Sequence, residues 1–242
     1  MKSYQMLIKK KKTEKNQKMN DNQGILLVNK SKNFSSFTLV KILRKITKIR
    51  KIGHAGTLDP FATGLMIMLL GKEYTKKSSF YINHDKEYLC KLHLGFTTKS
   101  FDSEEELTFF SDKIPTAEEL QRVLEKFQGT VEQIPPMYSA KKVNGQRLYS
   151  LARQDITIDR KPIQVTINTE LLSYVYPYVE LKISCSKGTY IRAIANDIGY
   201  LLGTGAYLIE LKRTKSGIFN LKDAIDQSCL TEEVNLQSYL IR

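Results

Sequence analysis

The sequence predicts an α+β fold in which a mixed sheet is flanked by helices. Its 242 residues, 41% of them hydrophobic and 26% charged, suit one large globular domain with a sizeable core. Segments with strand-like and helix-like periodicity are interspersed along the chain. They lack the strict strand–helix–strand rhythm of a doubly wound sheet, and no internal repeat is visible.

Residues 1–23 predict a disordered basic tail. They contain seven Lys against two acidic residues and almost no apolar periodicity, so +5 of the net charge lies here. A secretory signal would need an apolar run after the charges, and a mitochondrial presequence would favour Arg over Lys. Met19 is an alternative start of the chain.

The globular pattern begins at Gly24. The apolar run 24–30 predicts a strand, and Ser35-Ser36 precedes helical spacing from Phe37 to Ile46. Residues 53–64, rich in Gly, Thr, Asp and Pro, predict a structured loop that leads into the apolar segment 65–70. Apolar and polar residues alternate over 87–94, as in a half-buried strand.

The second half of the chain continues the mixed pattern. Thr116-Ala-Glu-Glu119 forms a capping box for a helix that reaches Phe127 and is stopped by Gly129. A Pro-led segment over 134–153 mixes Tyr, Lys and Arg. The remaining expected elements are strands at 163–175, 179–185 and near 206–212, a helix from about 190 to 202, and a short helical segment around 221–225.

The charge balance points to a polyanionic partner. The chain carries 38 Lys and Arg against 25 Asp and Glu, a formal charge of +13. Nucleic acid and an anionic membrane surface both fit such a charge. The tail lacks an amphipathic apolar face, and the longest apolar run, Leu65–Leu70, is far too short to span a bilayer. We therefore expect nucleic acid and no membrane.

The three cysteines argue against both zinc and disulfides. Cys90, Cys185 and Cys229 are widely spaced, with no C-x-x-C pair and no His at ligand spacing. A reducing compartment is the simplest expectation, so we predict a cytoplasmic protein without a bound metal.

The segment from Lys51 to Gly64 is the most informative stretch of the sequence. Three glycines and a proline fix its backbone path, which presents one histidine, His54, and one carboxylate, Asp59. Spacing alone leaves two interpretations open. Asp59-Pro60 either opens a turn or helix that Asp59 caps, or presents the carboxylate for chemistry.

Five motifs in order resemble the TruB family of pseudouridine synthases. GHAGTLDPFATG over 53–64 is similar to the family's active-site loop, and IPPMYSAKK over 134–142 with the residues up to Arg153 resembles its RNA-gripping insertion, at about 130–155. The other three are the opening motif over 24–30, DKEY over 85–88 and SKGTYIR over 186–192. The resemblance implies a pseudouridine synthase fold with a mainly antiparallel sheet, and one catalytic domain over 24–242.

The resemblance also implies an activity. Members isomerise uridine to pseudouridine in the T loop of tRNA, at position 55. The bond from ribose C1′ to uracil N1 breaks, the base turns, and it rejoins through C5. No redox change or group transfer occurs, so no cofactor is expected.

Site residues follow from the matched motifs. Asp59 matches the essential carboxylate, which in chemical terms can attack C1′ or C6, stabilise an oxocarbenium ion or remove a proton. Arg192 matches the arginine that pairs with it, and a guanidinium holds a carboxylate in a two-pronged geometry. Tyr88 matches the tyrosine that stacks on the extruded base; a core aromatic is the alternative. His54 resembles the histidine that fills the vacated space, and Tyr190 is a second candidate for the pocket wall.

Phosphate contacts are expected from basic residues in the motif segments. Lys187 is the strongest candidate, because the Gly-Thr turn beside it presents backbone N–H groups to an anion. The full set is Lys30, Lys51, Lys142, Arg147 and Lys187.

The chain departs from the family pattern in two places. Ser31-Lys32-Asn33 follows Lys30 where the family usually has Pro-x-Gly, so the turn there is expected to be less rigid. The small C-terminal RNA-binding domain of many bacterial relatives is expected to be absent. The basic tail then offers electrostatic compensation, a hypothesis that deletion of residues 1–20 tests through tRNA affinity and its salt dependence.

Two alternatives remain open at this point. A guide-dependent or other-RNA pseudouridine synthase would share these motifs, and a non-catalytic RNA-binding or RNA-folding protein would share the charge. The compact chain and the presence of Asp59, Tyr88 and Arg192 favour a stand-alone tRNA enzyme that acts on the T arm. Nothing in the sequence demands more than a monomer.

Overall fold

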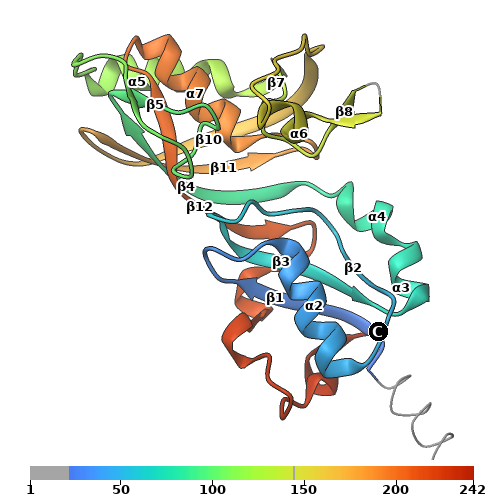
Figure 1. Ribbon diagram of the computed structural model, residues 1–242. Helices are drawn as coiled ribbons and strands as arrows, with labels where there is room; N and C mark the ends of the chain where they lie inside the picture. The colour runs from blue at the N-terminus through green and yellow to red at the C-terminus, as the bar shows by residue number, and fades with distance from the viewer. Residues whose placement is uncertain (1–21, 144) are drawn as a thin grey trace, which may run out of the picture. The chain divides into compact units, whose positions relative to one another are not determined.

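The computed structural model describes residues 22–143 and 145–242, which form two compact units (Figure 1). Unit 1 contains the described residues up to His84 together with Arg213–Arg242, and unit 2 contains Asp85–Lys212. The predicted tail lies outside the described residues except for its last two positions. One catalytic domain over 24–242 stays a prediction.

Unit 1 is built around strand β3 (Thr63–Leu70). Strand β1 (Gly24–Lys30) runs antiparallel to it, in register from Gly24 opposite Leu70 to Lys30 opposite Gly64. Strand β2 (Ile52–His54) is its second antiparallel neighbour. From Gly64 to Leu70 every residue of β3 is buried, which explains why its sequence is a continuous apolar run and does not alternate.

Helix α2 (Ser36–Thr47) packs its apolar residues Leu39, Val40 and Leu43 into the core of unit 1. The Ser35 side chain caps it by accepting a hydrogen bond from the Thr38 amide at 3.1 Å, as the predicted start requires. Helices α3 (Lys72–Lys76) and α4 (Ser78–Ile82) follow β3 and have no counterpart in the sequence analysis.

Short elements complete unit 1. Strand β14 (Ile225–Asp226) runs parallel to β1, and β15 (Leu240–Ile241) runs antiparallel to it. The others are β13 (Phe219–Asn220) and the 3-10 turns η2 (Leu221–Asp223), η3 (Gln227–Cys229) and η4 (Leu236–Tyr239).

Unit 2 contains an antiparallel sheet of longer strands. Its order is β4 (Lys86–Leu94), β11 (Tyr178–Cys185), β10 (Ile163–Val175) and β7 (Gly129–Gln133). Strand β12 (Ala206–Ser216) begins in unit 2 and ends in unit 1. Two small ladders join β5 (Phe96–Thr97) to β6 (Thr108–Phe109) and β8 (Lys142–Val143) to β9 (Gln146–Arg147).

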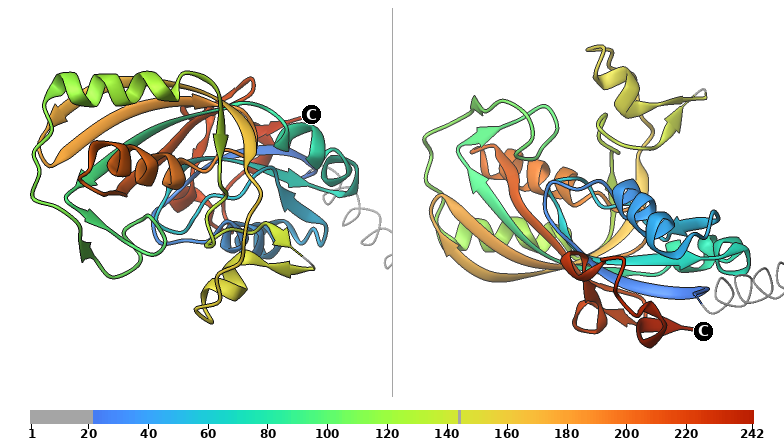
Figure 2. Two further views of the ribbon diagram at one scale, coloured as in Figure 1. Left: turned by 90° about the horizontal axis from the view of Figure 1, so that it is seen from above. Right: turned by 60° about the horizontal axis from the view of Figure 1, so that its bottom comes forward.

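Helices α5 (Ala117–Leu124) and α7 (Ile191–Leu202) pack side by side in unit 2 (Figure 2). The capping box of α5 forms both of its hydrogen bonds, between the Thr116 hydroxyl and the Glu119 amide and between the Glu119 carboxylate and the Thr116 amide. The 3-10 turn η1 (Glu125–Phe127) extends α5. Gly129, at φ +78°, then starts β7, as its predicted role as a helix stop implies. Helix α6 (Leu148–Ala152) follows β9.

The predicted fold class is confirmed. The elements alternate without a βαβ rhythm, and the ladders named above are antiparallel apart from β1 with β14. Most long predicted elements also match their observed bounds within a few residues. The elements that were not predicted are short strands, turns and helices of five residues, which are too short to show a periodic pattern in the sequence.

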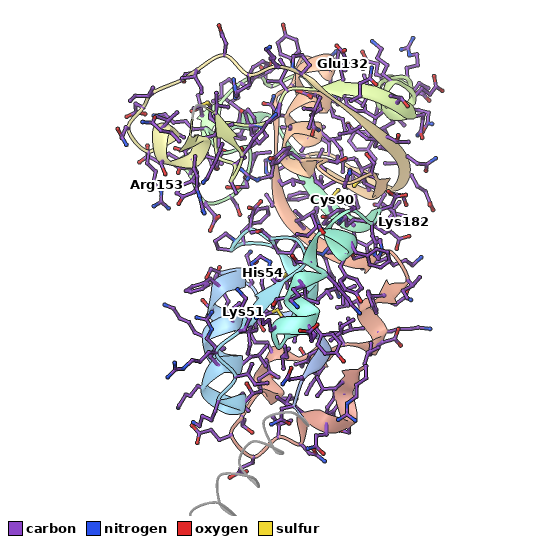
Figure 3. All side chains as sticks on the ribbon, turned by 90° about the vertical axis from the view of Figure 1, so that its right-hand side faces the viewer. Lys51, His54, Cys90, Glu132, Arg153 and Lys182 are labelled. Atoms are coloured by element: carbon purple, nitrogen blue, oxygen red, sulfur yellow. The ribbon has the colours of Figure 1, made fainter. Side chains whose placement is uncertain are left out.

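All three cysteines are free thiols. Cys90, on β4, and Cys185, on β11, are buried, and Cys229 on η3 is exposed (Figure 3 labels Cys90). Burial raises the pKa of Cys90 to about 12, with a smaller contribution from nearby Cys185.

Among the described residues, no helix is both long enough and apolar enough to cross a membrane.

We predict that Thr116→Ala lowers the free energy of unfolding by about 1 kcal/mol, because it removes the hydroxyl that caps α5. Urea unfolding measures this difference. Thr116→Ser keeps the hydroxyl and serves as the control, with an expected change of a few tenths of a kcal/mol. Equal losses in both variants would contradict a capping role.

Candidate active site

The Asp59 loop, residues 55–62, connects β2 to β3 in unit 1. It leaves the ladder at Ala55, whose amide donates to the Ile67 carbonyl at 2.9 Å. Asp59 is half-buried, and its carbonyl accepts from the Ala62 amide at 3.1 Å, which closes a turn. No helix follows this turn, so the helix-capping alternative for Asp59 is wrong, while the turn itself is present.

Hydrogen bonds hold the backbone on both sides of Asp59. On one side, the Ser36 hydroxyl donates to the Leu58 carbonyl and accepts from the Leu58 amide, both at 2.9 Å. On the other side, the Pro60 carbonyl accepts from the Asn33 amide at 2.8 Å. Asp59 therefore lies between two anchored neighbours, an arrangement suited to a pre-positioned carboxylate.

Lys30 anchors the same loop from within the protein. Its side chain is 0% exposed, and its ammonium donates to the carbonyls of Ser31, Phe34 and Pro60 at 3.0, 2.7 and 3.1 Å. An ammonium has three N–H donors, and three carbonyls receive them. The predicted phosphate contact for Lys30 is therefore wrong, because a buried, fully coordinated ammonium does not reach a phosphate.

Related contacts hold the turn Ser31-Lys32-Asn33, which stands where the family usually has Pro-x-Gly. Asn33 adopts a left-handed conformation at φ +68°, which positions its amide for Pro60. Lys30 closes the turn over the Phe34 carbonyl. These hydrogen bonds hold the turn without the proline and glycine, and its lower rigidity stays a prediction.

Arg213, which the sequence analysis missed, holds the entry and exit of the Asp59 loop. Its side chain is 1% exposed; Nε donates to the Leu65 carbonyl at 2.7 Å and Nη2 to the Gly56 carbonyl at 3.2 Å. Gly64 must be glycine beside it, because a Cβ there would lie 2.4 Å from the Arg213 carbonyl oxygen and φ is +101°. The alternation of β12 could have predicted that Arg213 is buried, because it lies two positions after the buried Leu211 and so on the same face of the strand.

His54 ends β2, and Lys51 precedes the same strand (Figure 3). Burial lowers the pKa of His54, and the positive charge of Arg213 lowers it further, while a hydrogen bond with the Gly56 backbone partly offsets both. The imidazole is therefore neutral at pH 7. Lys51 is exposed, as a phosphate contact requires.

Arg192, in unit 2, is a buried cation at the start of α7. Its Nη1 donates to the Ser100 carbonyl at 2.7 Å and lies 3.4 Å from Asp102 Oδ2; its Nη2 donates to the Tyr138 carbonyl at 2.6 Å. Asp102 is itself oriented, because its Oδ1 accepts from the Ser100 hydroxyl at 2.6 Å and from the Glu104 amide at 3.0 Å. The sequence analysis missed Asp102.

The two predicted tyrosines occupy different environments in unit 2. Tyr88 lies on β4 and is 8% exposed, on the strand face that also carries Cys90. Tyr190 is half-buried at the N-cap of α7, and both polar groups of its backbone bind the Gln133 side chain: the amide to Oε1 at 2.8 Å and the carbonyl to Nε2 at 3.1 Å. Buried Gln133 was also missed; a polar residue that ends an alternating strand was its only signal.

The remaining basic candidates are exposed residues of unit 2. Lys142 and Arg147 face each other across the β8–β9 ladder within the predicted insertion. The Arg147 guanidinium lies 5.9 Å and that of Arg153 5.7 Å from the ring centre of Tyr149 (Figure 3 labels Arg153). Lys187 is exposed in a turn closed by the Thr189 hydroxyl, which donates to the Ser186 carbonyl at 2.9 Å.

The predicted site residues thus fall into two groups. His54, Lys51 and Asp59 lie together in unit 1, and Tyr88, Tyr190 and Arg192 belong to unit 2. Pairing of Asp59 with Arg192 and stacking by Tyr88 stay predictions. Among the described residues, no cluster of three or more His, Cys, Asp or Glu side chains is arranged to hold a metal ion.

Comparison with known proteins decides the family. Residues 44–191 match the N-terminal domain of the TruB family pseudouridylate synthases, and residues 192–240 match the tRNA pseudouridylate synthase B C-terminal domain. The chain belongs to the TruB family. The second match covers α7, β12 and the short elements after them; the expected absence of a separate RNA-binding domain stays a prediction.

Curated TruB relatives are similar over nearly the whole chain. The tRNA pseudouridine synthase B of Protochlamydia amoebophila is 51% identical over 220 residues, which is 91% of this chain and 84% of the relative. That of Chlamydia trachomatis serovar L2 is 47% identical over 219 residues, covering 90% and 91%.

Solved structures share the TruB fold. A chain of a Cbf5–Nop10–Gar1 complex matches with a TM-score of 0.68 and 25% identity over 87% of this chain and 54% of that one. A chain of an H/ACA RNP bound to a substrate RNA containing 2′-deoxyuridine matches with a TM-score of 0.64 and 23% identity, over 87% and 53%. This chain therefore spans about half the length of those solved chains.

We predict that His54 titrates below its ordinary pKa of 6.5 in NMR spectra of the folded protein. Arg213→Gln removes the positive charge, one of the two causes that lower the pKa of His54, so the midpoint of the His54 titration should rise towards 6.5. A wild-type midpoint at or above 6.5 would contradict the described environment. Arg122→Gln, a surface change in unit 2, should leave the midpoint unchanged.

Proposed function

We propose that this protein isomerises uridine to pseudouridine in tRNA, at T-loop position 55. The observation that carries the proposal is the Asp59 loop, anchored by Ser36, Lys30 and Arg213, in a chain 47–51% identical to tRNA pseudouridine synthases B. The loop presents a half-buried carboxylate on an immobilised backbone.

The reaction is an internal rearrangement of one nucleotide. The C1′–N1 bond breaks, the uracil rotates, and a C1′–C5 bond forms; C5 then loses its proton and N1 ends protonated, so atoms and charge balance. No electrons are exchanged with another molecule, and we propose that the enzyme needs no cofactor. Asp59 is the proposed carboxylate, which acts by attack at C1′ or C6 or by removal of the C5 proton.

Arg192 is proposed to hold the Asp59 carboxylate in its reactive orientation. The support is its own immobilisation in unit 2, where Asp102 and the carbonyls of Ser100 and Tyr138 fix the guanidinium. A pre-oriented arginine loses little entropy when it binds a carboxylate in two-pronged geometry. In this proposal Asp102 is a positioning residue that acts through Arg192.

Extrusion of the target base needs stacking and space filling. Tyr88 is proposed to stack on the extruded uracil, a contact worth about 1–3 kcal/mol in comparable RNA sites. Tyr190 is the second proposed pocket wall, with its backbone fixed by Gln133. His54, neutral at pH 7, is proposed to fill the space left in the RNA loop.

The proposed partner is the T arm of tRNA, bound by a cytoplasmic monomer. Phosphate contacts are assigned to the exposed residues Lys51, Lys142, Arg147 and Lys187. A guided reaction is the weaker alternative, because the curated relatives that are 47–51% identical to this chain are named as tRNA enzymes.

We predict that Asp59→Asn abolishes pseudouridine formation and leaves tRNA binding within a few-fold of wild type, because the amide keeps the shape but not the charge. A single-turnover assay with unmodified tRNA transcript, scored at the T-loop uridine, measures this. If wild type is also silent yet binds tRNA, the guided or purely RNA-binding alternative replaces the proposal. If Asp59→Asn formed pseudouridine at the wild-type rate, Asp59 would not be the essential carboxylate.

We predict that Asp102→Asn slows single-turnover conversion by about 10- to 100-fold, since loss of a charge-assisted contact costs about 1.5–3 kcal/mol. The affinity for tRNA should stay within a few-fold. Asp112→Asn, an exposed change in the same unit, should keep the wild-type rate. An Asp102→Asn protein with unaltered rate would show that Asp102 does not act through Arg192.

A further inference from the structure

Helix α2 carries an exposed basic stripe on the side opposite its core residues. The α2 stripe is Phe37, Lys41, Arg44, Lys45 and Lys48, all exposed, whereas Leu39, Val40 and Leu43 are buried. The helical spacing places the stripe residues on one face. None of them belongs to the motif residues to which phosphate contacts were assigned.

The surrounding sequence lacks acidic residues. Between Asp21 and Asp59 there is no Asp or Glu, while this segment carries eight Lys and Arg. Because α2 and its flanking residues carry basic but no acidic side chains, the local electrostatic potential is positive and attracts polyanions. A solvated helix of no function typically mixes both signs along its exposed face.

The α2 stripe begins at the Asp59 loop. Ser36, the first residue of α2, binds both backbone groups of Leu58, the neighbour of Asp59. From Phe37 to Thr47 the helix then extends by roughly 15 Å, at 1.5 Å per residue, and Lys48 caps its end. Helix α2 and the Asp59 loop both lie in unit 1, and the stripe begins at Phe37, one residue after the side chain that binds Leu58.

The stripe also offers an aromatic surface. Phe37 is 52% exposed, and Lys41 Nζ lies 5.4 Å from its ring centre. Cations interleaved with an accessible aromatic ring are a combination that binds nucleic acid strands, because the cations contact phosphates and the ring stacks on a base. The opposite, apolar face of α2 is buried in the core and is not available to insert into a lipid surface.

An acidic residue, Glu232, lies next to the stripe. Glu232 Oε1 lies 3.1 Å from Lys45 Nζ, and both side chains are largely exposed. The positive charges of Lys45 and Lys48 lower the pKa of Glu232. An exposed pair of this kind is weak, so a phosphate can displace the carboxylate.

We propose that the α2 stripe binds the sugar–phosphate backbone of RNA outside the target loop. The inference rests on the proposed function for the identity of the RNA, a tRNA whose reactive uridine lies at Asp59. The stripe then contacts a part of the tRNA beyond the T arm, and it adds affinity without adding sequence specificity.

The test compares two fourfold neutralised variants of the full chain. The stripe variant is Lys41→Gln, Arg44→Gln, Lys45→Gln and Lys48→Gln. The control removes the same number of Lys and Arg charges from exposed positions elsewhere: Arg122→Gln, Lys126→Gln, Lys161→Gln and Lys222→Gln. The dissociation constant is measured from about 50 to 200 mM salt for intact tRNA transcript and for an isolated T-arm stem–loop.

We expect the stripe variant to bind intact tRNA at least ten-fold more weakly at the lowest salt, with a salt slope reduced by about 2–3, while its binding of the T-arm stem–loop changes less than three-fold. The control should stay within about three-fold on both RNAs. Glu232→Gln removes the competing carboxylate and should tighten tRNA binding. Circular dichroism and unfolding in urea verify that both fourfold variants are folded.

Three results would overturn the proposal. Equal losses in stripe and control variants would mean that only net charge matters, and equal losses on both RNAs would place the stripe in T-arm binding. Loss of binding to vesicles with anionic phospholipid, with tRNA affinity unaltered, would assign the stripe to membranes. Since these are binding measurements, a wild-type protein that binds tRNA but makes no pseudouridine would refute the proposed function and leave the stripe test intact.

Discussion

The binding of buried cations to backbone carbonyls is the interaction on which the candidate active site depends. Removing a charged group from water costs several kcal/mol unless hydrogen bonds replace its hydration. Lys30 and Arg213 obtain this replacement from the carbonyls of Pro60, Gly56 and Leu65, which lie in or next to the Asp59 loop. The loop cannot change shape without leaving a buried charge unsolvated, so its conformation is coupled to the stability of unit 1.

Unit 2 uses the same solution with one addition. Arg192 binds backbone carbonyls, as the unit 1 cations do, but it also contacts a buried carboxylate, Asp102. The carboxylate lowers the cost of burying the guanidinium, and its own hydrogen bonds to Ser100 and Glu104 fix the direction of that contact. These contacts give the Arg192 guanidinium a fixed orientation within unit 2.

Periodicity allowed the long elements to be predicted from the sequence. The strands β1, β4, β10 and β11 and the helices α2, α5 and α7 have patterns long enough to distinguish a period of 2 from one of 3.6. Motif resemblance located the Asp59 loop and Arg192. What the sequence did not show is which polar residues turn inward, because their partners are distant in the chain: Arg213 binds Leu65 across 148 positions and Gln133 binds Tyr190 across 57. Lys30 was assigned to the surface for the same reason.

The environment of the cysteines has a consequence for oxidative damage. Peroxides attack the thiolate, and a thiol with a pKa of about 12, such as Cys90, forms almost none at neutral pH. Cys185 is shielded by burial in the neighbouring strand. Sulfenic acid formation is therefore directed to Cys229, on a surface turn remote in sequence from the Asp59 loop and from Arg192. A first oxidative event therefore falls outside β4 and β11, the strands that carry the two buried thiols.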